Sequence, residues 1–303
     1  MSEKSVVAEV SSILRLHIIG VAMAACVVFS WLMTGEYAIW LALLGGVDWM
    51  LINLLNRITD LTEDLVNEIR GTERVAAHKR AFVGTFVVIF VGSFALSLAF
   101  FPELTWLRVV VQFIGLAYSL PLIPTPSGWK RFKEIYFLKN FMSSVLFCFT
   151  VFLYPLAVAD WSTVLPGGLP AVALLIGFFI PFELTYEIIY DLRDLEGDQK
   201  AAIPTYPVAH GPHRARQIID GLLLLSGLVL TAGLATGLLG LREGLMLMAP
   251  LIQRAYYRPR YRRGLQPADC IWITHLGTAL LLFYVAGNEV WLALDMPANI
   301  YLV

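Results

Sequence analysis

The chain has 303 residues, of which 58% are hydrophobic and only 15% carry a charge, and its formal net charge is −1. Soluble globular domains carry about 25% charged residues, so this composition leaves too little polar surface to cover a body exposed to water. It excludes a soluble enzyme or binding module and predicts an integral membrane protein that crosses the bilayer several times.

Nine apolar segments are long enough, or nearly so, to cross a bilayer as helices, which takes about 20 residues each. The first eleven residues lack the basic segment of a cleavable signal peptide, so we expect the first span to be retained. We therefore predict an all-α membrane protein, a single bundle of nine helices around a central apolar cavity. In chain order the expected spans are 12–34, 38–56, 81–101, 104–123, 138–159, 168–190, 216–240, 243–257 (the shortest) and 271–294.

The loops between these spans alternate in length and charge. One set is short, and the other, at 57–80, 125–139, 191–216 and 254–269, is long and basic. Of the 22 Lys and Arg residues, all except Arg108 and Arg242 fall on the side of the long loops. The positive-inside rule then places the N-terminus and the long loops in the cytoplasm. We expect a multi-pass protein of a bacterial-type inner membrane or its equivalent.

The order of these elements predicts one domain, 1–303, with a weak internal repeat. Two four-helix halves, at about 12–123 and 138–257, are followed by a last helix at 271–294. The three cysteines, Cys26, Cys148 and Cys270, are widely spaced within apolar segments, so we interpret them as buried thiols that form neither disulfides nor a zinc site.

An acidic row follows the second span. Asn56, Asp60 and Asp64 are spaced i, i+4, i+8, which places them within about 80° of one face of a helix. A second row follows the sixth span, where Asp191, Asp194 and Asp198 are spaced i, i+3, i+7. Glu187 extends this second row by one turn. Carboxylates beside a membrane are costly, and two matched rows at the cytoplasmic ends of two spans point to a functional site.

Two further acids, Glu63 and Glu196, lie off the faces of these rows, and we interpret them as ordinary solvated residues.

Facing rows of carboxylates repel one another unless cations lie between them. Mg²⁺ is suited to this position because it binds one or two carboxylates and completes its octahedron with water and substrate phosphates. The expected substrate is a lipid diphosphate whose tail lies between the helices. There is no glycine-rich Walker loop, which argues against a nucleoside triphosphate.

Cationic side chains near the two rows are candidates to bind the phosphate oxygens by charge-assisted hydrogen bonds. We interpret Lys130, Arg131 and Lys200 as topology determinants. The other candidates are Arg70, Arg74, Lys133, Lys139 and Arg193.

With these motifs the sequence resembles the UbiA superfamily of intramembrane prenyltransferases. The first family motif, Asn-x-x-x-Asp-x-x-x-Asp, matches Asn56, Asp60 and Asp64, and the arginines that follow it match Arg70 and Arg74. The second, Asp-x-x-x-Asp, matches Asp194 and Asp198. The segment 205–211, Tyr118-Ser119-x-Pro121 and Lys133 with Lys139-Asn140 fall where the family has similar residues.

The resemblance implies a Mg²⁺-dependent transfer of a prenyl group from a prenyl diphosphate, with release of pyrophosphate, to an aromatic or other lipophilic acceptor. The implied metal ligands are Asp60, Asp64, Asp194 and Asp198, with Asn56 as an added ligand. To these we add Asp191 from the second acidic row, although several family members have Asn or Ala at its position. The implied diphosphate-binding residues are Asn56, Arg70, Arg74, Lys133, Lys139 and Arg193. We expect membrane lipid around the protein and no nucleic-acid partner.

Residues deeper in the spans are candidates to act on the prenyl group and the acceptor. Aromatic faces such as those of Tyr118, Phe182 and Tyr186 would shield an allylic cation. Glu183 and Glu187 would orient the acceptor or take up its proton, and Glu187 is our candidate for a catalytic role. The histidines (His17, His78, His210, His213, His275) show no shared ligand spacing, and we assign them no role.

Two alternatives stay open at this point. A terpene cyclase on the same scaffold would ionise the diphosphate with the same residues, and only its products would differ. A transporter would instead need polar residues near the middle of the membrane, where the acids are Asp48 and Glu183, and both also suit the wall of an enzyme cavity.

Overall fold

The structure is a computed structural model that describes residues 3–66 and 69–302. The chain is almost wholly helical, with one small hairpin. The longer helices are α1 (Glu3–Leu14), α2 (Leu16–Thr34), α3 (Ile39–Thr59), α6 (Lys79–Phe100), α7 (Thr105–Ser119), α8 (Leu138–Cys148), α10 (Gly168–Arg193), α12 (Tyr206–Ala235), α14 (Met248–Arg263) and α15 (Pro267–Ala293). The shorter elements are α4 (Leu61–Val66), α5 (Thr72–Ala77), η1 (Pro102–Leu104), β1 (Ile123–Thr125), β2 (Gly128–Lys130), η2 (Phe132–Glu134), η3 (Phe149–Leu153), α9 (Tyr154–Val158), α11 (Leu195–Lys200), α13 (Leu241–Gly244) and η4 (Leu245–Leu247).

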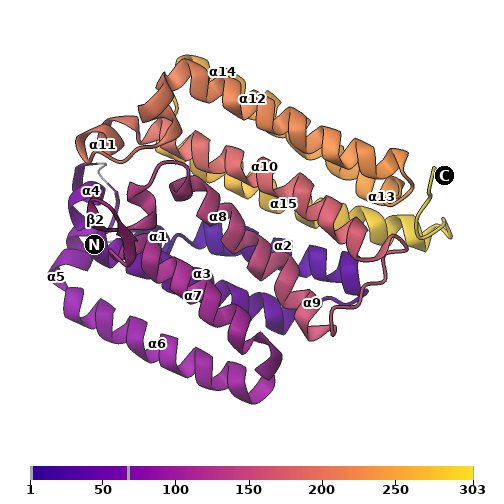
Figure 1. Ribbon diagram of the computed structural model, residues 1–303, viewed down its shortest axis with the longest axis horizontal. Helices are drawn as coiled ribbons and strands as arrows, with labels where there is room; N and C mark the ends of the chain where they lie inside the picture. The colour runs from indigo at the N-terminus through magenta and orange to yellow at the C-terminus, as the bar shows by residue number, and fades with distance from the viewer. Residues whose placement is uncertain (1–2, 67–68, 303) are drawn as a thin grey trace.

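The long helices run side by side along the longest axis of the molecule (Figure 1). The short helices α4, α5 and α11 gather with the hairpin at one end, and α9, α13 and the C-terminal segment lie at the other. We call the first the motif end, because it contains both acidic rows, and the second the far end. Inside the bundle α10 packs against α8, α12 and α15, and α2 packs against α3 and α15.

Seven helical segments in the described part of the chain are long and apolar enough to cross a membrane. They are α2, α3, α6, the continuous run 138–158 (α8, η3 and α9), α10, α12 and α15. The protein is therefore a multi-pass membrane protein with an all-α bundle, as the sequence predicts. Each of the seven corresponds to one of the predicted spans.

The other two predicted spans are helical but short. The segment 104–123 corresponds to α7, which has 15 residues, and 243–257 corresponds largely to α14, which has 16 and ends in a basic turn. Both fall below the ~20 residues that a perpendicular crossing needs. Nine crossings remain a prediction.

The loop before Lys133 contains the hairpin, which we did not predict. Strands β1 and β2 pair antiparallel in the register Ile123 with Lys130, and Gly128 adopts a left-handed conformation with φ of 111°. Such a conformation suits glycine, which has no Cβ to clash. The hairpin leads directly into η2 and so directs the basic loop back toward the first acidic row.

The three cysteines are free and buried, as expected. Asp48, which we interpreted as suited to a cavity wall, is instead completely buried in a hydrogen-bond network. Its carboxylate accepts bonds from Arg108 Nε at 3.1 Å and Nη2 at 2.6 Å, and Gln112 and Tyr154 donate to it at 2.8 and 2.9 Å. This buried network joins α3, α7 and α9. We call it the interior charge network.

Candidate active site

Each acidic row lies at a break between two helices. At Asp60 the long helix α3 ends and α4 begins, and at Asp194 the long helix α10 ends and α11 begins. Both residues have similar non-helical backbone angles, φ −98° and ψ 24° at Asp60 and φ −91° and ψ 10° at Asp194. Each row is therefore bent at its middle residue. The spacing in the sequence predicts one straight helical face for each row, and the structure differs in this respect. Because α4 contacts α11, the two rows come together at the motif end.

The first row is bonded to cations of the basic loop and of its own helix. Lys133 Nζ lies 2.8 Å from Asp60, and Arg57 Nη1 lies 2.7 Å from Asp64. The Asn56 amide, oriented to satisfy both of its groups, donates to Asp60 at 2.5 Å and accepts from Arg15 at 3.3 Å. All these groups are at least half buried, so their charges act on one another with little screening.

The second row has a matching set of partners. Lys139 Nζ bridges two carboxylates, at 2.8 Å from Asp191 and 3.1 Å from Asp198, and Asn140 donates to Asp191 at 2.6 Å. Arg193 forms an ion pair with Asp194. Both acidic rows thus contact a lysine that the sequence marks as a candidate, Lys133 at the first row and Lys139 at the second.

Two of our interpretations of single residues in this region are wrong. Glu63 is not simply solvated, because it accepts from Lys133 Nζ at 2.6 Å and lines the same cavity as the rows. Arg131 is not only a topology determinant, because its Nη1 lies 3.2 Å from Asp60. Glu196 is exposed, as expected, and it also pairs with Lys200.

The two predicted arginines after the first row have different positions. Arg70 lines the cavity that contains the acidic rows. Arg74 is not among the described residues of the cavity wall, and its Nε pairs with Glu9 at 2.8 Å. The structure therefore brings Arg70, and not Arg74, to the cavity that contains the predicted metal ligands.

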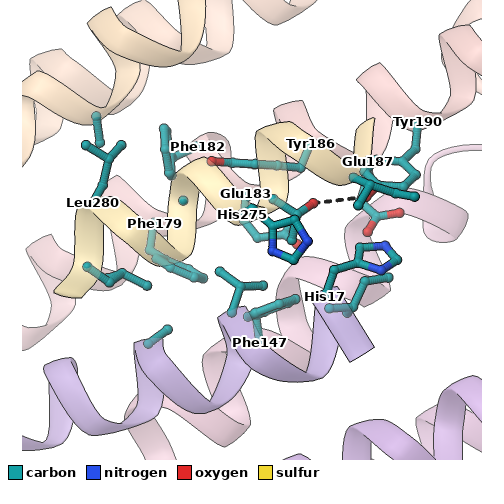
Figure 2. A pocket seen from close by; sticks show the side chains of 18 of the residues that line it. His17, Phe147, Phe179, Phe182, Glu183, Tyr186, Glu187, Tyr190, His275 and Leu280 are labelled. Carbon is teal, nitrogen blue, oxygen red and sulfur yellow. Dashed lines mark hydrogen bonds between the residues drawn. The ribbon is translucent and has the colours of Figure 1, made fainter. Parts of the chain in front are cut away.

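The cavity has a volume of about 1090 Å³ and extends from the acidic rows deep into the bundle. Its walls come mainly from α2, α10 and α15, and in Figure 2 the side of the view with Glu187, Tyr190 and His17 is polar, while Phe147, Phe179 and Leu280 make the other side apolar. A charged mouth that continues into a hydrocarbon-like interior suits a ligand with an anionic head and an apolar tail.

Two glutamates of α10 lie on the wall between the mouth and the interior. Ser143 donates to Glu187 at 2.8 Å, and Ser144 donates to Glu183 at 3.1 Å. The aromatic side chains of Tyr118, Phe182 and Tyr186, predicted as candidates to shield a cation, also line the cavity.

Two histidines that we left without a role meet across this cavity. The rings of His17, at the start of α2, and His275, on α15, have centroids 6.3 Å apart at an angle of 63°. Both line the same cavity as Glu183 and Glu187 (Figure 2). No spacing in the sequence could reveal this pair, because 258 residues separate its members.

The mouth is balanced in charge. Among the described residues of the cavity wall at this end, six are acidic (Asp60, Glu63, Asp64, Asp191, Asp194, Asp198) and six are basic (Arg15, Arg57, Arg70, Lys133, Lys139, Arg193). Burial raises the pKa of Asp198 to about 6, against the opposing charge of Lys139, and burial also raises the pKa of Asp60. Ionised carboxylates in such surroundings are stabilised by nearby cations.

The donor set fits Mg²⁺ in one particular way. All of its candidate ligands are oxygen atoms of carboxylates or an amide, which is the ligand type that Mg²⁺ prefers. Within the described ranges no three His, Cys, Asp or Glu side chains form a metal-holding group on their own. The site thus fits ions that take one or two carboxylates each and obtain their other ligands from water and phosphate. Asp60 and Asp64 would hold such an ion from one side, and Asp194 and Asp198 from the other.

A model of the UbiA prenyltransferase family matches residues 13–271, most of the chain and both acidic rows. The chain belongs to the UbiA prenyltransferase family. The resemblance that the motifs indicate is thereby confirmed.

Curated relatives and solved structures agree with this assignment. Digeranylgeranylglyceryl phosphate synthase from Halobacterium salinarum is 31% identical over 180 residues, which cover 59% of this chain and 56% of the relative. The match therefore spans little more than half of that protein's length.

Two solved structures have the same fold as this UbiA-family protein. A UbiA homolog from Archaeoglobus fulgidus bound to GPP and Mg²⁺ has a TM-score of 0.69 at 16% identity, over 91% of this chain and 97% of the homolog. The same homolog bound to DMAPP and Mg²⁺ gives a TM-score of 0.69 at 16% identity, over 90% and 96%. At this identity the similarity establishes the fold.

Proposed function

We propose that this protein is a Mg²⁺-dependent prenyltransferase, which transfers an isoprenyl group from a prenyl diphosphate to a lipophilic acceptor and releases pyrophosphate. The observation that carries the proposal is the convergence of the two acidic rows at one mouth of an apolar cavity. Family membership and the GPP and DMAPP complexes of the Archaeoglobus homolog support it. The predicted Mg²⁺ ligands belong to this proposal.

The side chains at the mouth bind and orient the diphosphate. Lys133 and Lys139, together with Arg70 and Arg193, line the cavity as donors for phosphate oxygens, and each contributes a charge-assisted hydrogen bond. Asp60, Asp64, Asp194 and Asp198 would hold Mg²⁺ ions, which would supply positive charge to neutralise the departing pyrophosphate. Because Lys133, Lys139 and Arg193 are already held in place by carboxylates, these side chains need little reorganisation as that charge develops.

The interior of the cavity holds the prenyl tail and excludes water from the reacting carbon. The bond from C1 of the prenyl group to the diphosphate oxygen breaks, and its electron pair leaves with pyrophosphate. Tyr118, Phe182 and Tyr186 offer aromatic faces to the resulting allylic cation. The acceptor forms the new bond to C1 and loses a proton to Glu187, which lines the cavity.

The class of acceptor is aromatic or another lipophilic molecule. The name of the curated relative, which refers to a glyceryl phosphate product, supports a lipid alcohol. A terpene cyclase on the same scaffold would use the same mouth, and the experiment below separates the two reactions.

We further propose that the chain crosses the membrane nine times, with α7 and the α13–α14 segment as the two short crossings. The motif end then faces the cytoplasm, because the long basic loops lie at that end. A diphosphate, which does not cross a bilayer, would reach the mouth from the cytoplasm.

Pyrophosphate release from membranes that contain the protein tests the proposal. The assay supplies Mg²⁺ and a panel of prenyl diphosphates, with and without aromatic and lipid-alcohol acceptors. The control is the double variant Asp60→Ala, Asp194→Ala, checked for correct insertion. We expect release that depends on an acceptor and is lost in the control.

Two other results would change the proposal. Release without an acceptor, with a cyclic hydrocarbon or alcohol as the product, would establish a cyclase. No release with any donor from correctly inserted protein would contradict a prenyl diphosphate as substrate.

A further inference from the structure

A second cavity lies between α14 and α15, and the proposed reaction does not use it. It has a volume of about 480 Å³ and is lined by Tyr256 and Arg260 of α14 and by one side of α15. Helix α15 begins at the motif end and runs to the far end, where the C-terminus lies (Figure 1). We call this second cavity the outer groove.

The outer groove changes from polar to apolar along α15. The residues of α15 that line it are, in order, Asp269, Trp272, His275, Leu276 and Ala279. Between the first and the last of these the helix rises about 15 Å. The headgroup layer on each side of a bilayer is only about 5–8 Å thick. A groove of this length therefore covers the headgroup layer and continues into the hydrocarbon.

Trp272 marks the level of the membrane interface. Its side chain is 63% exposed, and exposed tryptophans concentrate at the level of the lipid headgroups. Asp269 lies one helical turn from Trp272 toward the motif end, and Arg260 Nε lies 3.4 Å from its carboxylate. The guanidinium of Arg260 is thus at the polar end of the groove, in the headgroup layer.

Arg260 has hydrogen-bond donors that the protein does not use. Its guanidinium lies over the ring of Tyr256 at 3.5 Å, which fixes its orientation. Within the described ranges its only hydrogen bond runs from Nη1 to Tyr256 O at 2.8 Å, and the buried Nε has no hydrogen-bond partner. A guanidinium held in this way offers a rigid set of donors, and phosphate oxygens match that geometry.

The one acid of the groove is already engaged. The carboxylate of Asp269 accepts from Gln266 N at 2.9 Å and from Arg263 Nη2 at 2.7 Å, in addition to its ion pair with Arg260. Its negative charge is therefore balanced by two arginines, and it does not repel an anion at the other side of the Arg260 guanidinium.

The end of α14 beside the groove is strongly basic. Asp220 pairs with two of its arginines and Asp269 with two more, and the fifth makes no ion pair in the described part of the chain. The five are Arg254, Arg258, Arg260, Arg262 and Arg263. This surplus of positive charge next to the membrane attracts anionic headgroups.

We propose that the outer groove binds one anionic phospholipid of the surrounding membrane. Its phosphate lies at Arg260, Tyr256 and Trp272 flank its glycerol, and an acyl chain follows Leu276 and Ala279. A zwitterionic lipid is disfavoured because its ammonium group meets the basic end of α14. This inference does not depend on prenyl transfer.

The lipid would lie against the outer side of the candidate active site. His275 lines both the outer groove and the cavity that contains the acidic rows. Its ring contacts Trp272 on one side, with centroids 5.7 Å apart, and His17 on the other. A lipid in the groove thus packs on a side chain of the cavity wall. Because a ligand that binds only the folded state stabilises it, this lipid should raise the unfolding temperature.

Two pairs of variants separate the groove from the general charge and shape of the surface. Arg260→Met and Arg262→Met remove the same charge from the same helix, but Arg262 is exposed and does not line the groove. Ala279→Leu fills the apolar part of the groove. Ala286→Leu adds the same side chain two turns further along α15, at an exposed position outside both described cavities.

The experiment titrates the purified protein in detergent with dioleoyl phosphatidylglycerol or dioleoyl phosphatidylcholine and counts bound lipids by native mass spectrometry. We expect the first phosphatidylglycerol to bind the wild type about tenfold more tightly than phosphatidylcholine. Arg260→Met should weaken phosphatidylglycerol binding about tenfold, and Arg262→Met at most about twofold. Ala279→Leu should weaken it and Ala286→Leu should not. Phosphatidylglycerol should raise the unfolding temperature of the wild type but not of Arg260→Met.

Three results would overturn the inference while the prenyltransferase proposal stands. One is equal affinity of the wild type for the two lipids. Another is an equal loss in Arg260→Met and Arg262→Met, which would show attraction by the basic surface as a whole. The third is displacement of the lipid by millimolar inorganic phosphate, which would show a simple anion site. If Arg260→Met does not fold, the comparison of Ala279→Leu with Ala286→Leu still decides.

Discussion

The interior charge network and the acidic rows are built from the same kinds of residues, yet they differ in what surrounds them. In the network Asp48 and Arg108 are completely buried, and the Asp48 carboxylate accepts four hydrogen bonds from three side chains. At the mouth, Arg57–Asp64, Lys133–Asp60 and Lys139–Asp198 are also paired, but all six residues line a cavity.

This difference separates a structural charge pair from a functional one. A carboxylate with all its hydrogen bonds inside the protein, and no cavity beside it, has no capacity for a ligand. In the proposed function, carboxylates that face the cavity would exchange a lysine or arginine partner for a metal ion, and the released side chain would then be available to the phosphate. Burial of charge in a membrane protein is therefore not enough to indicate function, although it is a reasonable first hypothesis.

The largest effect should come from breaking the interior network. Asp48→Ala leaves Arg108 buried without its counter-ion, and loss of one partner of a buried pair costs about 3–5 kcal/mol. We expect a strong decrease in the free energy of unfolding, measured by denaturant or thermal unfolding in detergent. Replacing both partners, in Asp48→Leu with Arg108→Met, should recover much of this loss, because no unpaired charge remains.

A double variant as unstable as Asp48→Ala would show that the network's hydrogen bonds, and not the unpaired charge, dominate its stability. The folded fraction of either variant should bind the donor normally, because neither Asp48 nor Arg108 lies on the described cavity wall.

At the mouth the same kind of substitution should act on activity instead. Asp60→Asn keeps the shape of the side chain but removes a charge that faces the cavity, and we expect pyrophosphate release to fall by about 10²–10³-fold. Because Asp60 is not part of a closed hydrogen-bond network, Asp60→Asn should lower the unfolding temperature of the protein far less than Asp48→Ala does. Steady-state rates and thermal unfolding of the same preparation measure both quantities.

An Asp60→Asn variant with normal turnover would contradict the placement of the diphosphate at this mouth. One that is as unstable as Asp48→Ala would remove the distinction between the two regions.

Part of the difference between the interior charge network and the acidic rows can be predicted from the sequence, and part cannot. The spacing of Asp60, Asp64, Asp194 and Asp198 predicts their grouping, and hydropathy predicts the helices before each row, because both depend on residues close together in the chain. The breaks at Asp60 and Asp194 are not visible in the spacing, which is equally consistent with continuous helices.

Contacts between distant parts of the chain could not be predicted. Asp48 is a mid-helix acid like Glu183, and only the rotation of α3 against α7 decides that it faces Arg108 and not the cavity. The meeting of His17 with His275, and of Arg131 with Asp60, likewise depends on how helices and the hairpin pack.

Glu187 allows a test of the proposed proton transfer inside the cavity. If it accepts the acceptor's proton, Glu187→Gln should reduce acceptor-dependent turnover by roughly 10²-fold, the lower range for a general base. In the proposed mechanism the substrate ionises at the mouth, so the apparent KM for the donor should stay near the wild-type value. The exposed Glu196 provides the control, and Glu196→Gln should have no effect.

Equal turnover in Glu187→Gln and the wild type would remove Glu187 from the chemistry. Its bond with Ser143 would then be structural, as in the interior network.

The smallest predicted effect concerns two adjacent basic residues that the sequence does not distinguish. Arg131 contacts Asp60 at 3.2 Å and Glu63 at 3.5 Å, whereas Lys130 ends strand β2 and makes no ion pair in the described structure. Arg131→Met removes a charge-assisted contact to Asp60, a carboxylate that we propose to bind Mg²⁺, and we expect the donor KM to rise by about tenfold. Lys130→Met should leave the donor KM unchanged. If both variants behave alike, Arg131 acts only through topology, and the basic loop reaches the site through Lys133 alone.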